Sequence, residues 1–161
     1  MVVKYGRYLP TCGLLLAAVL GGCGAKSQSA DGMGVGALRA MLAEADPSRR
    51  AQAAASLGHK GEGARDAVAD LVKCLKDEDL RVRLNTAVAL GQIGPAAADS
   101  VPALSASLND KEATVRRQVV MALGKIGPDA KSALPALEKA RQDEARIVRE
   151  AVDDAIRKIK G

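Results

Sequence analysis

Histidine and cysteine have the widest chemistry of any residues in this sequence, and both are scarce. The chain contains one histidine, His59, and three cysteines, Cys12, Cys23 and Cys74. A zinc site or a histidine-dependent catalytic triad needs several suitable side chains brought together. One histidine and a few scattered cysteines do not supply them. We therefore expect no catalytic residues, no metal and no cofactor, and we interpret His59 as a surface residue near a helix end.

Cys74 has two possible roles. It lies close to Lys73 and Lys76, and nearby positive charge lowers the pKa of a thiol and makes it reactive. The equivalent positions of the repeat described below hold methionine, serine and alanine. We therefore favour a small packing residue, and a reactive thiol is the alternative.

Arginines and acidic residues recur together along the chain. The arginines are Arg50, Arg83, Arg116 and Arg149, and the acidic residues six positions before them are Glu44, Asp77, Asp110 and Asp143. A row of arginines alone would indicate a binding site for anionic groups. Because an acid accompanies every arginine, we favour a structural ladder whose charges bridge the turns of stacked layers. If partly exposed, such pairs contribute about 0–1 kcal/mol each.

The spacing of these columns is the period of an internal repeat. Residues 77–94, DEDLRVRLNTAVALGQIG, match residues 110–127, DKEATVRRQVVMALGKIG, after a shift of 33 positions. A period of this size is typical of a repeat array. Apolar residues at helical spacing predict two helices in each repeat.

Each first helix has recognisable ends. Asp79 is a candidate N-cap, and Gly94 and Gly127 are followed by proline, so we expect these glycines in the left-handed conformation that ends a helix. Gly91 and Gly124 fall inside the helices, where glycine costs about 1 kcal/mol relative to alanine. We predict that a neighbouring backbone passes too close there for a side chain.

The whole array is predicted to be an all-α solenoid of stacked antiparallel helix pairs. Residues 35–161 contain half a repeat, three full repeats and a closing helix, about eight helices in all. Proline lies in the first turn of two second helices, at Pro102 and Pro135. In the closing helix Arg157 takes the place of the recurring glycine, as suits a polar outer face at the end of an array.

The pattern D-x-x-x-x-V-R-x-x-x-x-x-A-L-G-x-I-G-P, followed by V-P-A-L, resembles the HEAT family, and more narrowly the short HEAT-like repeats of phycobilisome lyases. The resemblance covers Val35 to about Lys160. Some HEAT-like hydroxylases hold iron with repeated His-Glu pairs, which this sequence lacks. Fold alone does not define function.

The resemblance also implies a binding face, because second helices line the concave side of HEAT arrays. The outward positions there are Arg65, Asp66, Asp70, Lys73, Lys76, Asp99, Ala103, Lys131, Glu138 and Lys139. This face mixes charges with small residues and has no aromatic anchor, although interface hot spots favour tryptophan, tyrosine and arginine. We expect a modest, polar protein interface, and solvated surface is the alternative for each residue.

The N-terminus is typical of an exported protein. Lys4 and Arg7 precede the apolar run TCGLLLAAVL at residues 11–20, which is too short to span a bilayer that needs about 20 apolar residues. The following residues, Leu20-Gly21-Gly22-Cys23, resemble the lipobox of bacterial lipoproteins. That resemblance implies a signal peptide over residues 1–22 and a lipid on Cys23, with the outer membrane as destination if the cell is Gram-negative. An ordinary signal or an uncleaved anchor is the alternative.

Residues 23–34 then read as the lipidated cysteine and a flexible tether rich in glycine, serine and alanine. The net charge of +5 falls to +3 once Lys4 and Arg7 are removed, leaving 22 basic against 19 acidic residues. Such a weak, mixed excess is poor support for a nucleic-acid partner.

Together these features predict a membrane-anchored, non-catalytic scaffold or adaptor of the bacterial envelope that binds another envelope or membrane protein. Three alternatives stay open: a lyase-like enzyme or ligand handler for tetrapyrroles, a nucleic-acid-binding domain, and a structural spacer.

Overall fold

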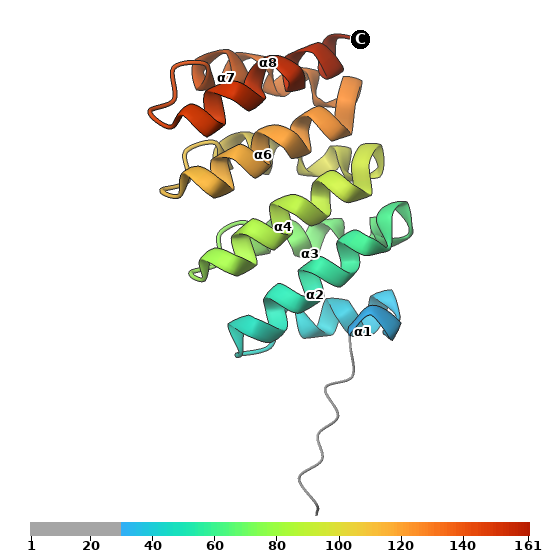
Figure 1. The fold of residues 1–161 in the computed structure, drawn as a ribbon. Coiled ribbons are helices and arrows are strands. Elements are labelled where there is room, and N and C mark those ends of the chain that lie inside the picture. Colours follow the sequence, from blue (N-terminus) through green and yellow to red (C-terminus); the bar gives the residue numbers. More distant parts are fainter. Residues whose placement is uncertain (1–29) are drawn as a thin grey trace, which may run out of the picture.

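The computed structural model describes residues 30–161, which form a single stack of helices (Figure 1). The predicted signal peptide, Cys23 and the tether up to residue 29 lie outside the described residues. Four long helices follow one another through the stack: α2 (Pro47–His59), α4 (Leu80–Ile93), α6 (Ala113–Ile126) and α8 (Arg146–Lys160). Four short helices alternate with them: α1 (Val35–Met41), α3 (Val68–Cys74), α5 (Val101–Ser107) and α7 (Leu134–Ala140). The predicted all-α solenoid is confirmed.

Each second helix of a repeat is divided into two parts. A 3₁₀ segment comes first, namely η2 (Gly61–Ala67), η3 (Gly94–Ser100) or η4 (Gly127–Ala133), and the α-helical part follows. Pro102 and Pro135 lie in the first turns of α5 and α7, as predicted. Because proline has no N–H to donate to the preceding turn, it suits this junction between the two helix types.

The ends of the long helices are set by side-chain caps and glycine. The Asp79 carboxylate accepts hydrogen bonds from the backbone N–H groups of Arg81 at 2.8 Å and Val82 at 3.3 Å. Gly94 ends α4 with φ 69° and ψ −138°, and Gly127 ends α6 with φ 75° and ψ −139°. The positive φ is as predicted, but ψ differs from the left-handed helical value. This extended, positive-φ region is adopted almost only by glycine.

The recurring glycine inside each long helix lies where two helix backbones meet. A Cβ atom on Gly91 would lie 2.9 Å from the Cα atom of Ala122, and one on Gly124 would lie 2.9 Å from the Cα atom of Ala155. These separations are too short for a side chain. The prediction that a neighbouring backbone passes close to each glycine is confirmed.

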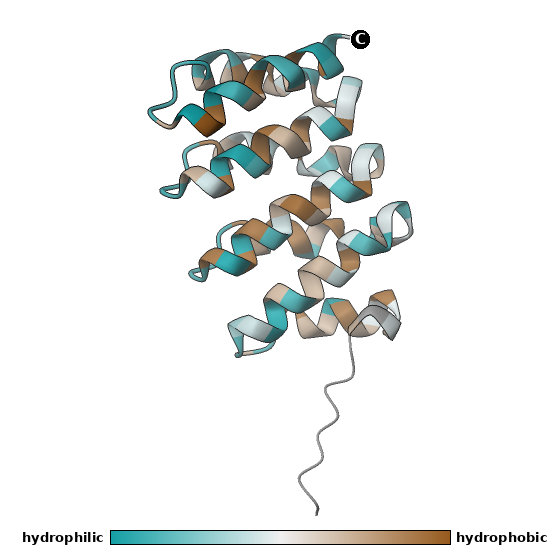
Figure 2. Ribbon diagram, in the orientation of Figure 1, coloured by the Kyte–Doolittle hydropathy of each residue, from teal (hydrophilic) through white to brown (hydrophobic). Residues whose placement is uncertain are grey.

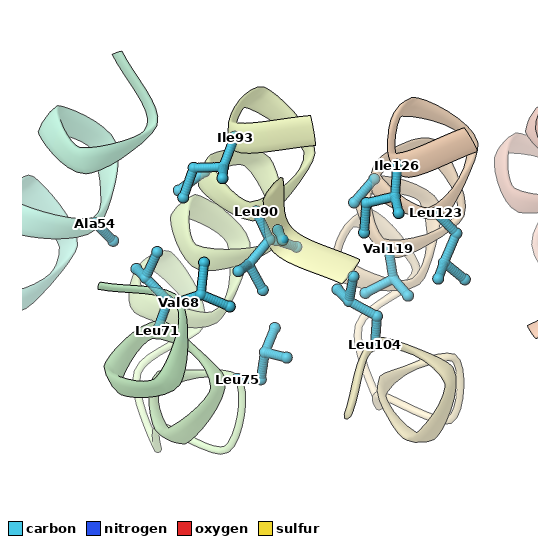
Figure 3. Packing of buried hydrophobic residues seen from close by; sticks show 14 of the residues in the cluster. Ala54, Val68, Leu71, Leu75, Leu90, Ile93, Leu104, Val119, Leu123 and Ile126 are labelled. Atoms are coloured by element: carbon cyan, nitrogen blue, oxygen red, sulfur yellow. The ribbon is translucent and has the colours of Figure 1, made fainter. Parts of the chain in front are cut away.

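The core consists of aliphatic side chains that recur in every layer. Leu71 and Leu90 meet between α3 and α4, and Leu104 and Leu123 lie in the next layer along the stack (Figure 3). Figure 2 shows hydrophobic segments in every layer of helices and hydrophilic segments in most of the connecting turns. Each layer therefore packs on its neighbours without aromatic residues.

Thr86 is the exception within this core, because its hydroxyl is buried without a hydrogen-bond partner among residues 30–161. Valine occupies the equivalent positions, Val119 and Val152. Replacing Thr86 with valine should raise the free energy of unfolding by about 1 kcal/mol, since an unsatisfied buried polar group is removed. Urea denaturation would measure this. Thr114→Val, at an exposed site, should change stability by less than about 0.5 kcal/mol, and a lower midpoint for Thr86→Val would contradict the prediction.

The two layers of the stack are spaced differently. Successive long helices are in close contact, whereas α3, α5 and α7 make few contacts with one another. That the second helices line a concave face stays a prediction.

The first described residues also differ from expectation. The flexible tether was predicted to reach residue 34, but Ala30–Gly32 form a short 3₁₀ helix, η1, which contacts α2. Ala30 is 1% exposed. Ala30 therefore belongs to the hydrophobic core of the array.

Candidate functional site

The arginine column joins successive repeats through buried ion pairs. Each arginine binds the aspartate of the following repeat, 27 residues later: the Nε–Oδ2 distance is 2.7 Å for Arg50–Asp77, 2.7 Å for Arg83–Asp110 and 2.8 Å for Arg116–Asp143. The Nη2 atom binds the second carboxylate oxygen in all three pairs. We call these three pairs the ladder. Arg50, Arg83 and Arg116 are therefore paired, and they do not form a row of free arginines.

The acid six positions before each arginine also contributes its backbone. Its backbone carbonyl accepts a hydrogen bond from the arginine Nη1 atom, at 3.0 Å for Glu44–Arg50 and 3.0 Å for Asp77–Arg83. One arginine thus fixes the turn of its own repeat and the carboxylate of the next. At the N-terminal end, the Glu44 carboxylate pairs instead with Arg49.

Acid should weaken the ladder. Hydrogen bonds from Arg50 and Arg116 lower the pKa of Asp77 and of Asp143, respectively, below the ordinary value of 3.8. A lowered pKa in the folded state means that the pairs stabilise the protein above the ordinary pKa, and that this stability is lost as the pH falls through the folded pKa.

The variant Asp143→Asn provides the measurement. Its melting temperature should lie well below that of the wild type at about pH 7, and the gap should narrow as the pH falls below 3.8 toward the lowered pKa of Asp143. Asp129→Asn, at an exposed position, is the matched control and should follow the wild type throughout. A gap that does not narrow at all as the pH falls below 3.8 would show that the carboxylate charge is not what matters.

Cys74 and His59 occupy ordinary structural positions. Cys74 is 8% exposed, and burial raises the pKa of its thiol, with Asp77 adding to the effect. The thiol is thus held in its less reactive form, which suits packing. His59 is exposed in the last turn of α2. Across residues 30–161, no group of three or more histidine, cysteine, aspartate or glutamate side chains is placed to hold a metal ion. No helix in the same region is long and apolar enough to cross a bilayer.

The residues predicted for protein binding lie on the wider-spaced side of the stack and do not form one cluster. Lys73 and Lys76 border a groove between α3 and α5, whose lining includes Val72, Leu75, Ala103 and Ala106. Lys139 borders the equivalent hollow between α5 and α7. Arg65, Asp66 and Asp99 line a third hollow beside the start of α3. Lys131 is exposed on η4.

Three of these residues are already engaged within the chain. The Asp70 carboxylate accepts hydrogen bonds from Arg39 at 2.7 Å and from Lys73 at 2.9 Å. Glu138 pairs with Arg141 at 3.1 Å. A partner would have to displace these contacts, so Asp70, Lys73 and Glu138 are the weaker members of the predicted set. That the others bind a protein stays a prediction.

The opposite side of the stack has a feature that the sequence interpretation missed. The outward positions of α4 include Leu84 and Val88, and those of α6 include Arg117 and Met121. Leu84, Val88 and Met121 are half-buried and Arg117 is exposed. We call these four residues the central patch. Toward α8, Arg117 and Met121 line a hollow together with polar residues, among them Lys125, Glu150, Asp154 and Lys158.

An apolar centre with a polar rim is the usual anatomy of a protein interface. Methionine adapts to different partner surfaces, and arginine is frequent among hot spots. The two exposed large hydrophobic residues among those described, Leu80 and Ile147, start α4 and α8 on the same layer. The sequence carried a signal for this surface, because α4 has apolar residues well beyond its core-facing stripe.

Comparisons with known proteins agree with the fold. The family model of HEAT repeats matches residues 35–100 and 95–157. A comparison with curated protein sequences found no match. The CpcE–CpcF complex of phycocyanin lyase from Nostoc sp. PCC7120 is similar, with 27% identity over 78% of this chain and 52% of that chain, at a TM-score of 0.64.

Two further solved structures show the range of proteins built on this architecture. Human deoxyhypusine hydroxylase in complex with glycerol is 30% identical over 79% of this chain and 43% of that one, at a TM-score of 0.65. A designed armadillo repeat protein in complex with the peptide (KR)4 shares the fold at 19% identity, covering 76% of this chain and 62% of its own, at a TM-score of 0.66. This chain thus spans less than two thirds of each of these structures. Because the family model covers nearly all of residues 35–157, the chain belongs to the HEAT-repeat family.

Proposed function

We propose that this protein is a binding scaffold of the bacterial envelope, and that its central patch contacts another envelope or membrane protein. The single observation that supports this role is the central patch itself. It places Leu84, Val88, Arg117 and Met121 on the more closely spaced layer of a solenoid, with a polar rim around them. The designed armadillo protein bound to (KR)4 is an example of a similar fold that holds a peptide.

Membrane attachment belongs to the same proposal and depends on the N-terminal sequence. Leu20-Gly21-Gly22-Cys23 would direct cleavage before Cys23 and a lipid onto its thiol. Two or more acyl chains give stable anchoring. The repeat domain would then lie outside the cytoplasm, joined to the lipid by a short tether that ends at η1. If the cell is Gram-negative, the lipid would anchor it to the outer membrane.

A crosslinking pull-down tests both parts. Tagged full-length protein would be crosslinked in its own cells, solubilised from membranes and analysed by mass spectrometry, beside Cys23→Ser and Met121→Glu. One dominant envelope protein, reduced in both variants, is the expected result. Asp129→Lys, at an exposed position on η4, is the matched surface control and should capture as much as the wild type. Absence of a specific partner in every sample would contradict a scaffold role and favour a spacer.

A catalytic role is the second candidate function, because the similar structures include a phycocyanin lyase and a hydroxylase. The test is whether the purified full-length protein takes up a visible chromophore when incubated with a bilin. An absorbance band that co-elutes with the protein would support a ligand handler or lyase. Colourless protein would support the scaffold.

A further inference from the structure

The last arginine of the column differs from the three before it. Arg149 keeps the backbone contacts of its column, since its Nη1 atom donates to the carbonyl oxygens of Asp143 at 2.6 Å and Glu144 at 2.9 Å. In each inner pair, Nε and Nη2 bind both oxygens of an aspartate. The corresponding edge of Arg149 binds no carboxylate of the described residues. Within residues 30–161 no carboxylate lies within ion-pair distance of it.

We propose that Arg149 is a preformed binding site for an aspartate side chain of a protein partner. The guanidinium is already held by two carbonyl oxygens, so less side-chain freedom is lost when a ligand binds. Its Nε and Nη2 edge is the edge that binds carboxylate in the other three repeats. Planar, two-point binding of this kind is both strong and specific in geometry.

The inner pairs also define what the ligand looks like. Each aspartate of the ladder accepts a hydrogen bond from the backbone N–H two residues later: Asp77 from Asp79 at 2.9 Å, Asp110 from Glu112 at 2.9 Å and Asp143 from Ala145 at 2.8 Å. A helix begins just after each of these turns. The expected ligand is therefore an aspartate in a tight turn that leads into a helix of the partner.

A second copy of this chain stacking as a fifth repeat does not fit. Close stacking needs glycine where the next helix would cross, as at Gly91 and Gly124, and α8 has Arg157 there instead, with 78% of its side chain exposed. The partner must therefore approach the N-terminal end of α8 without lying along the helix. The Arg149 site would be a second contact with a protein partner, beside the central patch, and so it rests on the scaffold role proposed above. It does not depend on membrane attachment.

The test uses full-length protein in detergent micelles, labelled with ¹⁵N at arginine Nε and observed by NMR. The probe is a capped peptide of residues 142–147, QDEARI, which copies the Asp143 turn. The Arg149 Nε–H signal should move saturably toward the signals of Arg50, Arg83 and Arg116. A peptide with asparagine in place of the aspartate should bind at least about tenfold more weakly.

Matched variants decide between a specific site and general charge attraction. Because Arg149→Lys removes the observed signal itself, binding to this variant is followed on the signals of the peptide. Their titration should no longer saturate, while the three ladder signals stay in place and show that the variant is folded. Arg146→Lys, on the same helix, should leave the response unchanged. The proposal is overturned if Arg149 does not shift, if Arg146 and Arg157 shift equally, or if both peptides act alike. None of these outcomes depends on the pull-down of an envelope partner, so the two proposals fail separately.

Discussion

Replacing Gly91 and Gly124 together with alanine should lower the free energy of unfolding by about 4 kcal/mol, or about 2 kcal/mol for each site. A methyl group at either position would lie 2.9 Å from a backbone Cα atom of the next long helix. Backbone cannot rotate away as a flexible side chain can, so two layers of the stack must move apart. Alanine also favours the helix by about 1 kcal/mol, and the expected loss is what remains after that gain.

Gly36 is the matched control for this prediction. It lies inside α1, and a Cβ atom built on it would have nothing within 4 Å. Gly36→Ala should therefore leave stability unchanged or raise it by up to about 1 kcal/mol. Urea denaturation followed by circular dichroism measures both variants. If the double variant matched Gly36→Ala, the helices would not be as closely spaced as the structure has them.

Removing the Arg83 guanidinium should cost about 3–5 kcal/mol of unfolding free energy. Arg83 and Asp110 are buried, with side chains 6% and 9% exposed. Methionine would fill much of the space but would leave the Asp110 carboxylate without its cation. It would also leave the carbonyl oxygens of Asp77 and Glu78, which accept from Nη1 at 3.0 Å each, without their donor. An unpaired buried charge is the dominant part of this cost.

The same substitution at the end of the column provides the comparison. Arg149→Met removes two hydrogen bonds to backbone carbonyls but no buried ion pair, so it should cost only about 1 kcal/mol. The difference between the two sites separates the effect of the carboxylate from that of the carbonyl contacts. Equal losses at Arg83 and Arg149 would contradict the assignment of the stability to the ion pairs.

Much of this architecture was predictable because the 33-residue period repeats the same local chemistry. Asp79 caps α4, Gly94 and Gly127 take a positive φ, and Gly91 and Gly124 lie at helix crossings. Each of these depends on backbone geometry within or between adjacent repeats. An internal alignment therefore shows them directly.

The candidate surface was harder to predict. The columns show which residues are equivalent, but they do not show which layer of helices is more closely spaced. The columns predicted a ladder between stacked layers, but not which acid binds which arginine. Asp77 lies six residues from Arg83 in sequence, yet its carboxylate binds Arg50 of the preceding repeat, because the stack brings that arginine closer. Leu84 and Val88 were not among the predicted binding residues, because those were all taken from the second helices.

Site-specific photo-crosslinking tests the central claim most directly. A photoreactive amino acid would replace Met121 in the full-length protein in its own cells. A second variant of the same protein would carry it in place of Lys73, beside the α3–α5 groove. The proposed scaffold predicts a crosslink to one envelope protein from position 121 and none from position 73. A specific crosslink from position 73 alone would contradict binding at the central patch and would show that the partner binds the second helices.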